Sequence, residues 1–210
     1  MMLSRRSLLA AAAAAPAFRF PELREESGLV TGKLKSIKYK QIDGFLGAEQ
    51  IRWHYESHYG GALKTFTELE ARITEDKKTR AAKANSVVMH ELYFDTMTPE
   101  KLDPTADTNA TLKDRFGSLD RWIEDFRASA LSCEGWAVLA YHPVNRRLYN
   151  IASDAHDRGP IWFGVPLVVL DMYEHAFYLD FQNRKADYVK GFTEHLDWAE
   201  IERRIKAAIS

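Results

Sequence analysis

Residues 165–184 read VPLVVLDMYEHAFYLDFQNR, and the interpretation of the whole chain starts from this stretch. Its first six residues are apolar and predict a buried strand that ends at Asp171. Burying an ionised carboxylate without a partner costs several kcal/mol, so a cation is the natural partner for Asp171. His175 follows four residues later and offers an imidazole nitrogen. The stretch therefore predicts a strand that leads into a metal site.

Further candidate ligands come from the seven histidines of the chain. His54 and His58 stand four residues apart in the segment IRWHYESH, so on a helix both rings project from one face. His90 lies on an apolar helical stretch and can supply another nitrogen. Three imidazoles and one carboxylate suit iron, manganese or zinc, and disfavour magnesium and calcium, which prefer all-oxygen ligand sets. With a trivalent ion such a site keeps a net positive charge, which favours one-electron exchange with a small anion.

The spacing of apolar residues divides the rest of the chain into a helical half and a mixed half. From Gly44 to about Met97 the spacing is helical and predicts two long antiparallel helices. A linker rich in Pro, Thr and Asp is expected over 98–109, and Ser118 can cap the helix that follows. Strands are expected over 135–142, 147–153 and 166–173, of which the first two form a hairpin.

A final helix is expected from Asp197, which forms a capping-box pair with Glu200. The fold class is therefore α+β, with a long antiparallel helical hairpin packed on a C-terminal domain in which helices surround a small three-stranded antiparallel sheet. The expected organisation is a signal peptide over 1–17, an N-terminal extension over 18–43, the helical hairpin domain over 44–104 and the α/β C-terminal domain over 105–210.

The N-terminus has the features of a targeting segment. Residues 4–17 read SRRSLLAAAAAAPA, which combines paired arginines, a weakly apolar stretch and small residues suited to cleavage. This pattern resembles a twin-arginine export signal and predicts a periplasmic or otherwise exported protein that folds before export. The apolar stretch is too short to span a bilayer, so no membrane insertion is expected after export. The alternative is a disordered Ala-rich tail.

Composition excludes several other classes of protein. The chain has 210 residues and is 46% hydrophobic and 28% charged, as ordinary globular proteins are. Its 29 Lys and Arg against 30 Asp and Glu give a net charge of −1, so no overall positive field favours nucleic acid as a partner. The single cysteine, Cys133, cannot form an internal disulfide.

Several motifs together resemble one known family. Residues 171–178, DMYEHAFY, resemble the aspartate-x-tryptophan-glutamate-histidine-alanine-tyrosine-tyrosine signature of the iron/manganese superoxide dismutases. The segment WHYESH with its two histidines resembles the first metal-binding helix of that family, HELYF at 90–94 the second, and Gly135-Trp136 the start of the first strand. The resemblance covers about 44–208, and the motifs occur in the family's order. It implies an enzyme that disproportionates superoxide to dioxygen and hydrogen peroxide with one iron or manganese ion per subunit.

The resemblance also implies roles for individual residues. His58 is then not a ligand and lines the entrance to the site, while Glu174 and Tyr178 reach across the interface of a homodimer. Whether dimers pair into tetramers, and whether iron, manganese or both metals are used, stays open. The implied metal ligands are His54, His90, Asp171 and His175.

Around the ligands the chain departs from the family pattern. A family glutamine that donates a hydrogen bond to solvent at the metal is replaced by His156 at its loop position and by Ser86 at its helix position, so His156 is the expected donor. The gate tyrosine expected eight residues after His54 is Ala62, and Tyr59 is the nearest candidate to fill its volume. The resemblance also implies a role for Arg184, which is expected to steer superoxide toward the site.

The sequence thus predicts a superoxide dismutase and leaves two alternatives. Because Ala62 replaces the gate tyrosine, the chain can instead be a metal-binding relative without turnover. The same ligand set also occurs in other mononuclear metalloenzymes, such as an iron-dependent oxidase or a zinc hydrolase.

Overall fold

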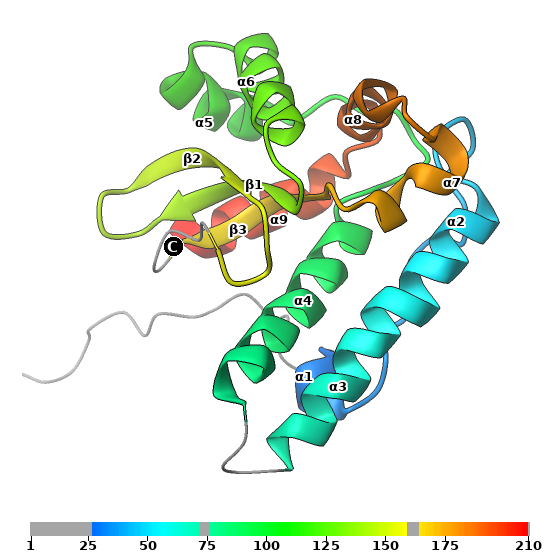
Figure 1. The fold of residues 1–210 in the computed structure, drawn as a ribbon. Helices are drawn as coiled ribbons and strands as arrows, with labels where there is room; N and C mark the ends of the chain where they lie inside the picture. The colour runs from blue at the N-terminus through cyan, green and yellow to red at the C-terminus, as the bar shows by residue number, and fades with distance from the viewer. Residues whose placement is uncertain (1–26, 72–75, 159–163, 210) are drawn as a thin grey trace, which may run out of the picture.

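The helical half of the molecule is a long hairpin. The computed structural model describes residues 27–71, 76–158 and 164–209, so the twin-arginine-like segment at 4–17 lies outside the described residues. In the hairpin, α4 runs antiparallel beside α3 (Figure 1), as the sequence predicts. A π-helical turn, η2, interrupts the first long helix at His54. The elements are α1 (Gly28–Thr31), α2 (Ala48–Trp53), η2 (His54–Tyr59), α3 (Gly60–Glu70) and α4 (Lys77–Asp95).

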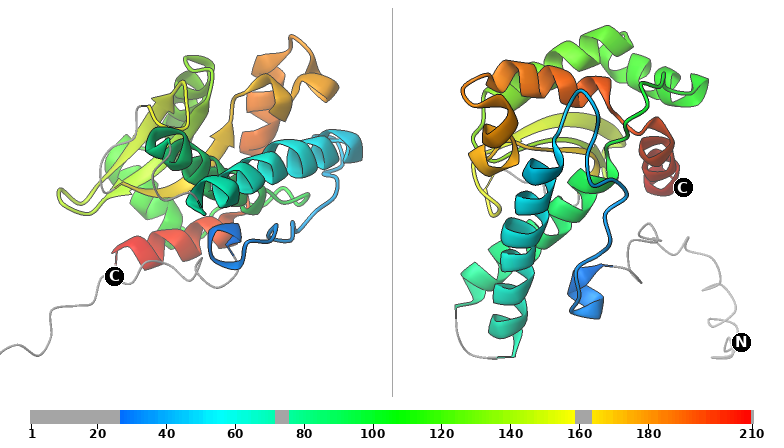
Figure 2. Two further views of the ribbon diagram at one scale, coloured as in Figure 1. Left: turned by 60° about the horizontal axis from the view of Figure 1, so that its bottom comes forward. Right: turned by 90° about the vertical axis from the view of Figure 1, so that its right-hand side faces the viewer.

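The C-terminal half is built around a three-stranded antiparallel sheet with the order β2-β1-β3, which confirms the α+β prediction. The sheet lies between α5 and α6 on one side and α4 and α9 on the other (Figure 2). The elements are α5 (Ala106–Phe116), α6 (Leu119–Leu131), β1 (Trp136–His142), β2 (Arg147–Ser153), β3 (Val165–Asp171), η3 (Glu174–Ala176), α7 (Tyr178–Phe181), α8 (Lys185–Glu194) and α9 (Trp198–Ile209).

The register of the sheet brings the start of the central strand next to the end of β3. Trp136 pairs with Ser153 on one side and with Asp171 on the other. The residue before it must be glycine, because a Cβ on Gly135 would lie 2.6 Å from the carbonyl oxygen of Ser153. The indole of Trp136 and the carboxylate of Asp171 therefore enter the same region of the molecule.

The helix caps agree with the sequence in part. The hydroxyl of Ser118 accepts a hydrogen bond from the first turn of α6, as predicted. At α9 only half of the capping box forms. Asp197 accepts from the N–H of Glu200 at 3.0 Å, but its own N–H donates to the carbonyl of Thr96, and the Glu200 carboxylate binds Arg204 at 2.7 Å instead.

The start of α5 corrects the expected linker. Residues 106–109 were expected to be part of the linker because their composition is polar, yet they form the first turn of α5. The hydroxyl of Thr105 accepts a hydrogen bond from the N–H of Thr108 at 3.3 Å, and this cap starts the helix.

One cluster of buried apolar residues runs through both halves, so the hairpin and the sheet share a core. The fully buried guanidinium of Arg204 links them: it donates to Thr96 Oγ1 and to the carbonyls of Leu92 on α4 and Leu167 on β3. Within the described ranges, every helix is too short or too polar to cross a bilayer.

Candidate metal centre

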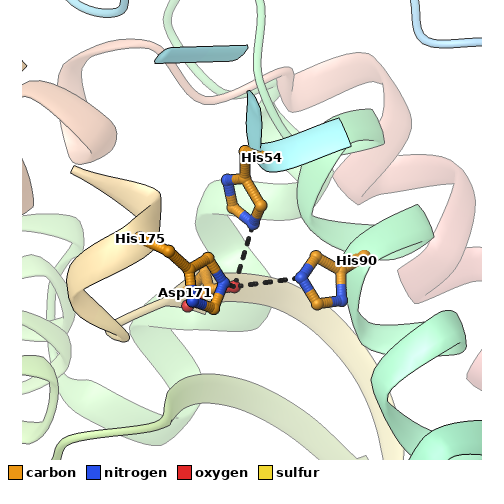
Figure 3. Close-up of side chains that lie close together, drawn as sticks. All are labelled: His54, His90, Asp171 and His175. Carbon is orange, nitrogen blue, oxygen red and sulfur yellow. Dashed lines mark hydrogen bonds and ion pairs between the residues drawn. The ribbon is translucent and has the colours of Figure 1, made fainter. Parts of the chain in front are cut away.

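Four side chains from both halves of the molecule converge beside the end of β3 (Figure 3). They are His54, His90, Asp171 and His175, and the atoms with which they could bind a metal all lie within 4.8 Å of one another. From Asp171 Oδ2, the Nε2 atoms of His54, His175 and His90 are 3.1, 3.4 and 3.6 Å away. The structure thus brings together the four ligands implied by the family resemblance and leaves His58 outside this cluster.

Asp171 is fixed by the end of its strand. It is fully buried, its Oδ1 accepts a hydrogen bond from the N–H of Tyr173 at 2.9 Å, and its carbonyl accepts one from the hydroxyl of Tyr188 at 2.8 Å. Oδ2 is therefore the oxygen that faces the histidines. Burial alone would raise the pKa of the carboxyl, but the contacts with His175 and His54 hold that pKa well below its usual value, so Asp171 is ionised.

His90 is held in the tautomer that a metal ligand requires. Its Nδ1–H donates to the carbonyl of Ser86, one turn earlier on α4, at 2.7 Å. Nε2 then carries the free lone pair, and burial lowers the pKa of the ring to about 3, which keeps it neutral. This Nε2 has no hydrogen-bond partner in the described part of the chain, and neither does Nε2 of His175.

His54 begins the π-helical turn η2. Its backbone N–H reaches the carbonyls of both Gln50 and Ile51, and its Nε2 lies 3.1 Å from Asp171 Oδ2. Burial lowers the pKa of His54 as well, despite the raising effect of Asp171. The π-helical turn also changes the relation of His54 to His58, because side chains four residues apart no longer lie one above the other as they do on an α-helix.

The unpartnered nitrogens test whether this site fits a metal. The Nε2 lone pair of His90 beside an ionised, buried carboxylate is unfavourable in the absence of a cation, whereas a cation between the four side chains satisfies all of them. Three imidazole nitrogens and one carboxylate oxygen form a donor set suited to iron or manganese. The residues present therefore fit such an ion.

The neighbours of the cluster differ in part from the sequence expectation. His58 stacks on His175 with ring centroids 3.7 Å apart, and partial burial together with His175 lowers its pKa to about 4. Tyr59 does not replace the gate tyrosine. It is fully buried, and its hydroxyl donates to Glu91 Oε1 at 2.8 Å and accepts from the N–H of Lys35, so only its ring faces His90.

His156 lies beside the cluster, with its ring centroid 6.5 Å from that of His90, and its role as a donor stays a prediction. Trp136 Nε1–H donates to its Nδ1 at 3.0 Å, and Asn85 on α4 donates to its carbonyl at 2.8 Å. Because an indole N–H can only donate, the proton of the neutral His156 ring sits on Nε2. Burial lowers the pKa of His156, which favours that neutral form.

The other three predicted residues also lie outside the cluster. Glu174 is exposed, and Tyr178 is 52% exposed on α7. Arg184 is exposed and interacts with Asp187 at 3.5 Å and with the carbonyl of Asp180 at 3.0 Å. Its role in steering an anion stays a prediction, as do the interface roles of Glu174 and Tyr178.

Sequence reasoning missed two residues that hold this site, Gln50 and Asn85. Gln50 is buried and hydrogen-bonded to the backbone of His175, and Asn85 holds the His156 loop. A polar residue within an apolar helical face was the available signal for Gln50. Nothing in the sequence distinguishes Asn85 from an ordinary surface residue.

An α+β fold that brings three histidines and one buried aspartate around a common point has the donor set of a protein that binds iron or manganese. Comparison with known proteins agrees. Residues 104–204 match the family model described as iron/manganese superoxide dismutases, C-terminal domain.

Curated relatives extend this match over most of the chain. The chain is 36% identical over 188 residues to superoxide dismutase [Mn] of Mycobacterium intracellulare, with 82% of this chain and 90% of that protein covered. It is 29% identical over 192 residues to superoxide dismutase [Fe] of Aquifex pyrophilus, with 82% and 90% covered. It is also 28% identical over 185 residues to superoxide dismutase [Mn] 2 of Haloferax volcanii, with 82% and 93% covered. The chain belongs to the iron/manganese superoxide dismutase family.

Proposed function

We propose that the protein is a superoxide dismutase in which the four clustered side chains hold one iron or manganese ion per subunit. The observation that carries this proposal is the pair of unpartnered Nε2 atoms, on His90 and His175, beside the buried carboxylate of Asp171. Iron or manganese held there supplies the one-electron exchange that converts two superoxide ions and two protons into dioxygen and hydrogen peroxide.

The residues of the chain have separate tasks in that reaction. Asp171 brings a fixed negative charge that stabilises the higher oxidation state, and His54, His90 and His175 set the geometry. His156 holds a proton on Nε2 and supports a donor role toward oxygen species at the centre. His58, stacked on His175, restricts water on that side of the ring.

The identity of the metal, iron or manganese, is a separate question. Relatives named for manganese match at 28% and 36% identity and one named for iron at 29%, and the short side chain of Ser86 contacts Nδ1 of His90 at 3.4 Å. The expected hydrogen-bond donor is therefore His156 alone, which favours activity with either metal.

Metal analysis combined with turnover tests the function. The purified protein is analysed for metal as isolated and after reconstitution with iron or manganese, and superoxide consumption is measured per bound ion. We expect one ion per subunit and rapid consumption of superoxide. Tight metal binding with negligible turnover would instead identify a metal-binding family member without activity, the alternative that Ala62 suggests. Turnover of other substrates, and only with zinc, would place the chain among other metalloenzymes.

We also propose a homodimer formed through the face that carries α2 and α7. Large side chains are exposed there: Trp53 is 48%, Tyr178 52% and Leu179 49% exposed. Glu174 lies on the same segment as His175 and can approach a second copy. Light scattering on the wild type and on Tyr178→Ala and Leu179→Ala variants tests this, because a dimer through this face should weaken in both.

The N-terminal segment supports a proposal about location. Paired arginines at 5 and 6 before a mild apolar stretch support export by a twin-arginine route to the periplasm or beyond. Replacing both arginines by lysine should leave the protein in the cytoplasm, as cell fractionation would reveal. Unchanged export would contradict this assignment without affecting the proposed enzyme activity.

A further inference from the structure

One buried side chain connects the backbones of two cluster residues. Gln50 on α2 is 2% exposed, and its carbonyl accepts a hydrogen bond from the N–H of His54. Its side-chain Nε2 donates to the carbonyl of His175 at 2.6 Å, and its Oε1 accepts from the N–H of Leu179 at 3.0 Å. Gln50 therefore links the backbone of His54 to the backbone of His175.

The chemistry of this position requires an amide. The carbonyl of His175 lies in the single turn of η3 and the N–H of Leu179 lies in the first turn of α7, and such short helices leave these groups unsatisfied. A glutamine side chain supplies one donor and one acceptor at once. Glutamate lacks the donor, leucine lacks both groups, and asparagine is one methylene shorter.

We propose that Gln50 is a positioning residue that holds His175 in register with His54 and thereby sets how slowly the metal is released. This inference rests on the metal site of the proposed function. The ring of His175 stacks on His58, but its side chain is 20% exposed and its Nε2 has no hydrogen-bond partner within the described residues, so the backbone contact with the buried Gln50 is its hydrogen-bonded anchor. Without the amide, the carbonyl of His175 loses its hydrogen bond to the helix that leads into His54.

A second contact between the same two elements provides a matched comparison. The N–H of Gly47 donates to Asp180 Oδ2 at 2.6 Å, in a solvent-exposed position. This bond also joins the start of α2 to α7, but neither partner touches the backbone of a cluster residue. An Asp180→Ala variant therefore loosens the same junction without removing a bond to His175.

The test compares metal release among variants loaded with the same ion. Manganese-loaded wild type, Gln50→Glu, Gln50→Asn, Gln50→Leu and Asp180→Ala are mixed with excess chelator, and the rate of metal loss is measured at neutral pH. We expect loss about tenfold or more faster in Gln50→Glu and Gln50→Leu, with Asp180→Ala close to the wild type. The visible absorption of the oxidised, manganese-loaded protein should also shift in Gln50→Glu, because a displaced His175 changes the ligand field. A loss of global stability alone would leave this absorption unchanged.

Several outcomes would overturn the proposal. Unchanged metal release and an unchanged spectrum in Gln50→Glu would do so even if urea unfolding showed a less stable protein. If Gln50→Leu fails to fold, Gln50→Glu decides, because the two side chains are nearly equal in size. A wild type that takes up no metal would overturn both proposals. Metal binding without dismutation, combined with fast release from Gln50→Glu, would contradict the proposed activity and support the role of Gln50.

Discussion

The indole N–H of Trp136 donates a 3.0 Å hydrogen bond to Nδ1 of His156 and so fixes which nitrogen of that imidazole carries the proton. An acceptor at Nδ1 leaves the only ring proton on Nε2 of the neutral histidine. The first strand and the loop after the second strand thereby cooperate to present one defined donor near the metal centre.

A Trp136→Phe variant removes this bond and keeps an aromatic ring. The proton of His156 can then occupy either nitrogen, so turnover per bound metal should fall about tenfold or more while metal content stays close to that of the wild type. Trp122→Phe is the matched control, because its indole N–H is also hydrogen-bonded, at 3.2 Å to Asn150, away from the cluster. Equal loss of turnover in both variants would contradict the role of Trp136.

An Asp171→Asn variant keeps the size of the side chain and removes its charge. The three histidines then face a neutral oxygen, so metal content measured after reconstitution should fall below about a tenth of the wild-type value, and activity should fall with it. Asp187→Asn removes an exposed carboxylate that pairs only loosely with Arg184, and it should retain both metal and activity. Full metal content in Asp171→Asn would refute the assignment of this ligand.

Acid should destabilise the metal-free protein already at pH values well above those at which carboxyl groups usually titrate. Burial lowers the pKa of His90 to about 3, so the unfolded chain binds a proton at this residue below pH 6.5 while the folded chain does not. Stability therefore decreases as pH falls from 6.5 toward 3, by about 1.4 kcal/mol per pH unit for each such histidine. The lowered pKa of Asp171 adds a loss in the same direction below about pH 4.

Urea unfolding of the metal-free protein between pH 7.5 and 4 measures this slope. A His90→Gln variant cannot ionise at this position and should show a shallower dependence on pH. Stability that is level from pH 7 to 5 in the wild type would show that these histidines are not buried in their neutral form.

An Arg204→Met variant should destabilise the protein by about 3 kcal/mol or more, because the carbonyls of Leu92 and Leu167 lose a buried, charged donor. Arg203→Met is the comparison: Arg203 binds the same glutamate, Glu200, from the exposed side of α9, and its loss should cost less than about 1 kcal/mol. Urea unfolding of both metal-free variants measures the difference. Similar values would mean that Arg204 contributes as an ordinary surface ion pair.

The parts of the fold that depend on local pattern could be predicted from the sequence. The apolar run before Asp171 and the cap at Ser118 act over a few residues, so strand β3 and helix α6 follow from them. The composition of 98–109 predicts a linker that holds for 98–105 but not for 106–109, because a threonine cap at Thr105 outweighs the polar content of the turn it starts. Half of the capping box at α9 fails because a tertiary partner, Thr96, takes the N–H of Asp197.

The four residues of the cluster could be named from the sequence, and the groups that hold them could not. Asp171 is unusual in its own sequence context, whereas Gln50 acts on a residue 125 positions away and Asn85 on one 71 positions away. Tyr59 shows the same limit: it is next to His58 in the chain, but its hydroxyl binds Glu91, 32 positions away. Contacts of this kind depend on how the helical half meets the sheet.

The cluster joins positions that lie far apart in the chain, since His54 and Asp171 are 117 residues apart. An ion bound by both residues would act as a reversible cross-link, because it would lower the conformational entropy of the unfolded chain by closing a very long loop. A disulfide of similar span stabilises a protein by up to about 5 kcal/mol through this effect. Unlike a disulfide, this link needs no oxidant and opens when the metal is withdrawn. The lifetime of the protein against proteases is therefore tied to the local supply of its ion, and unloaded copies are the ones removed first.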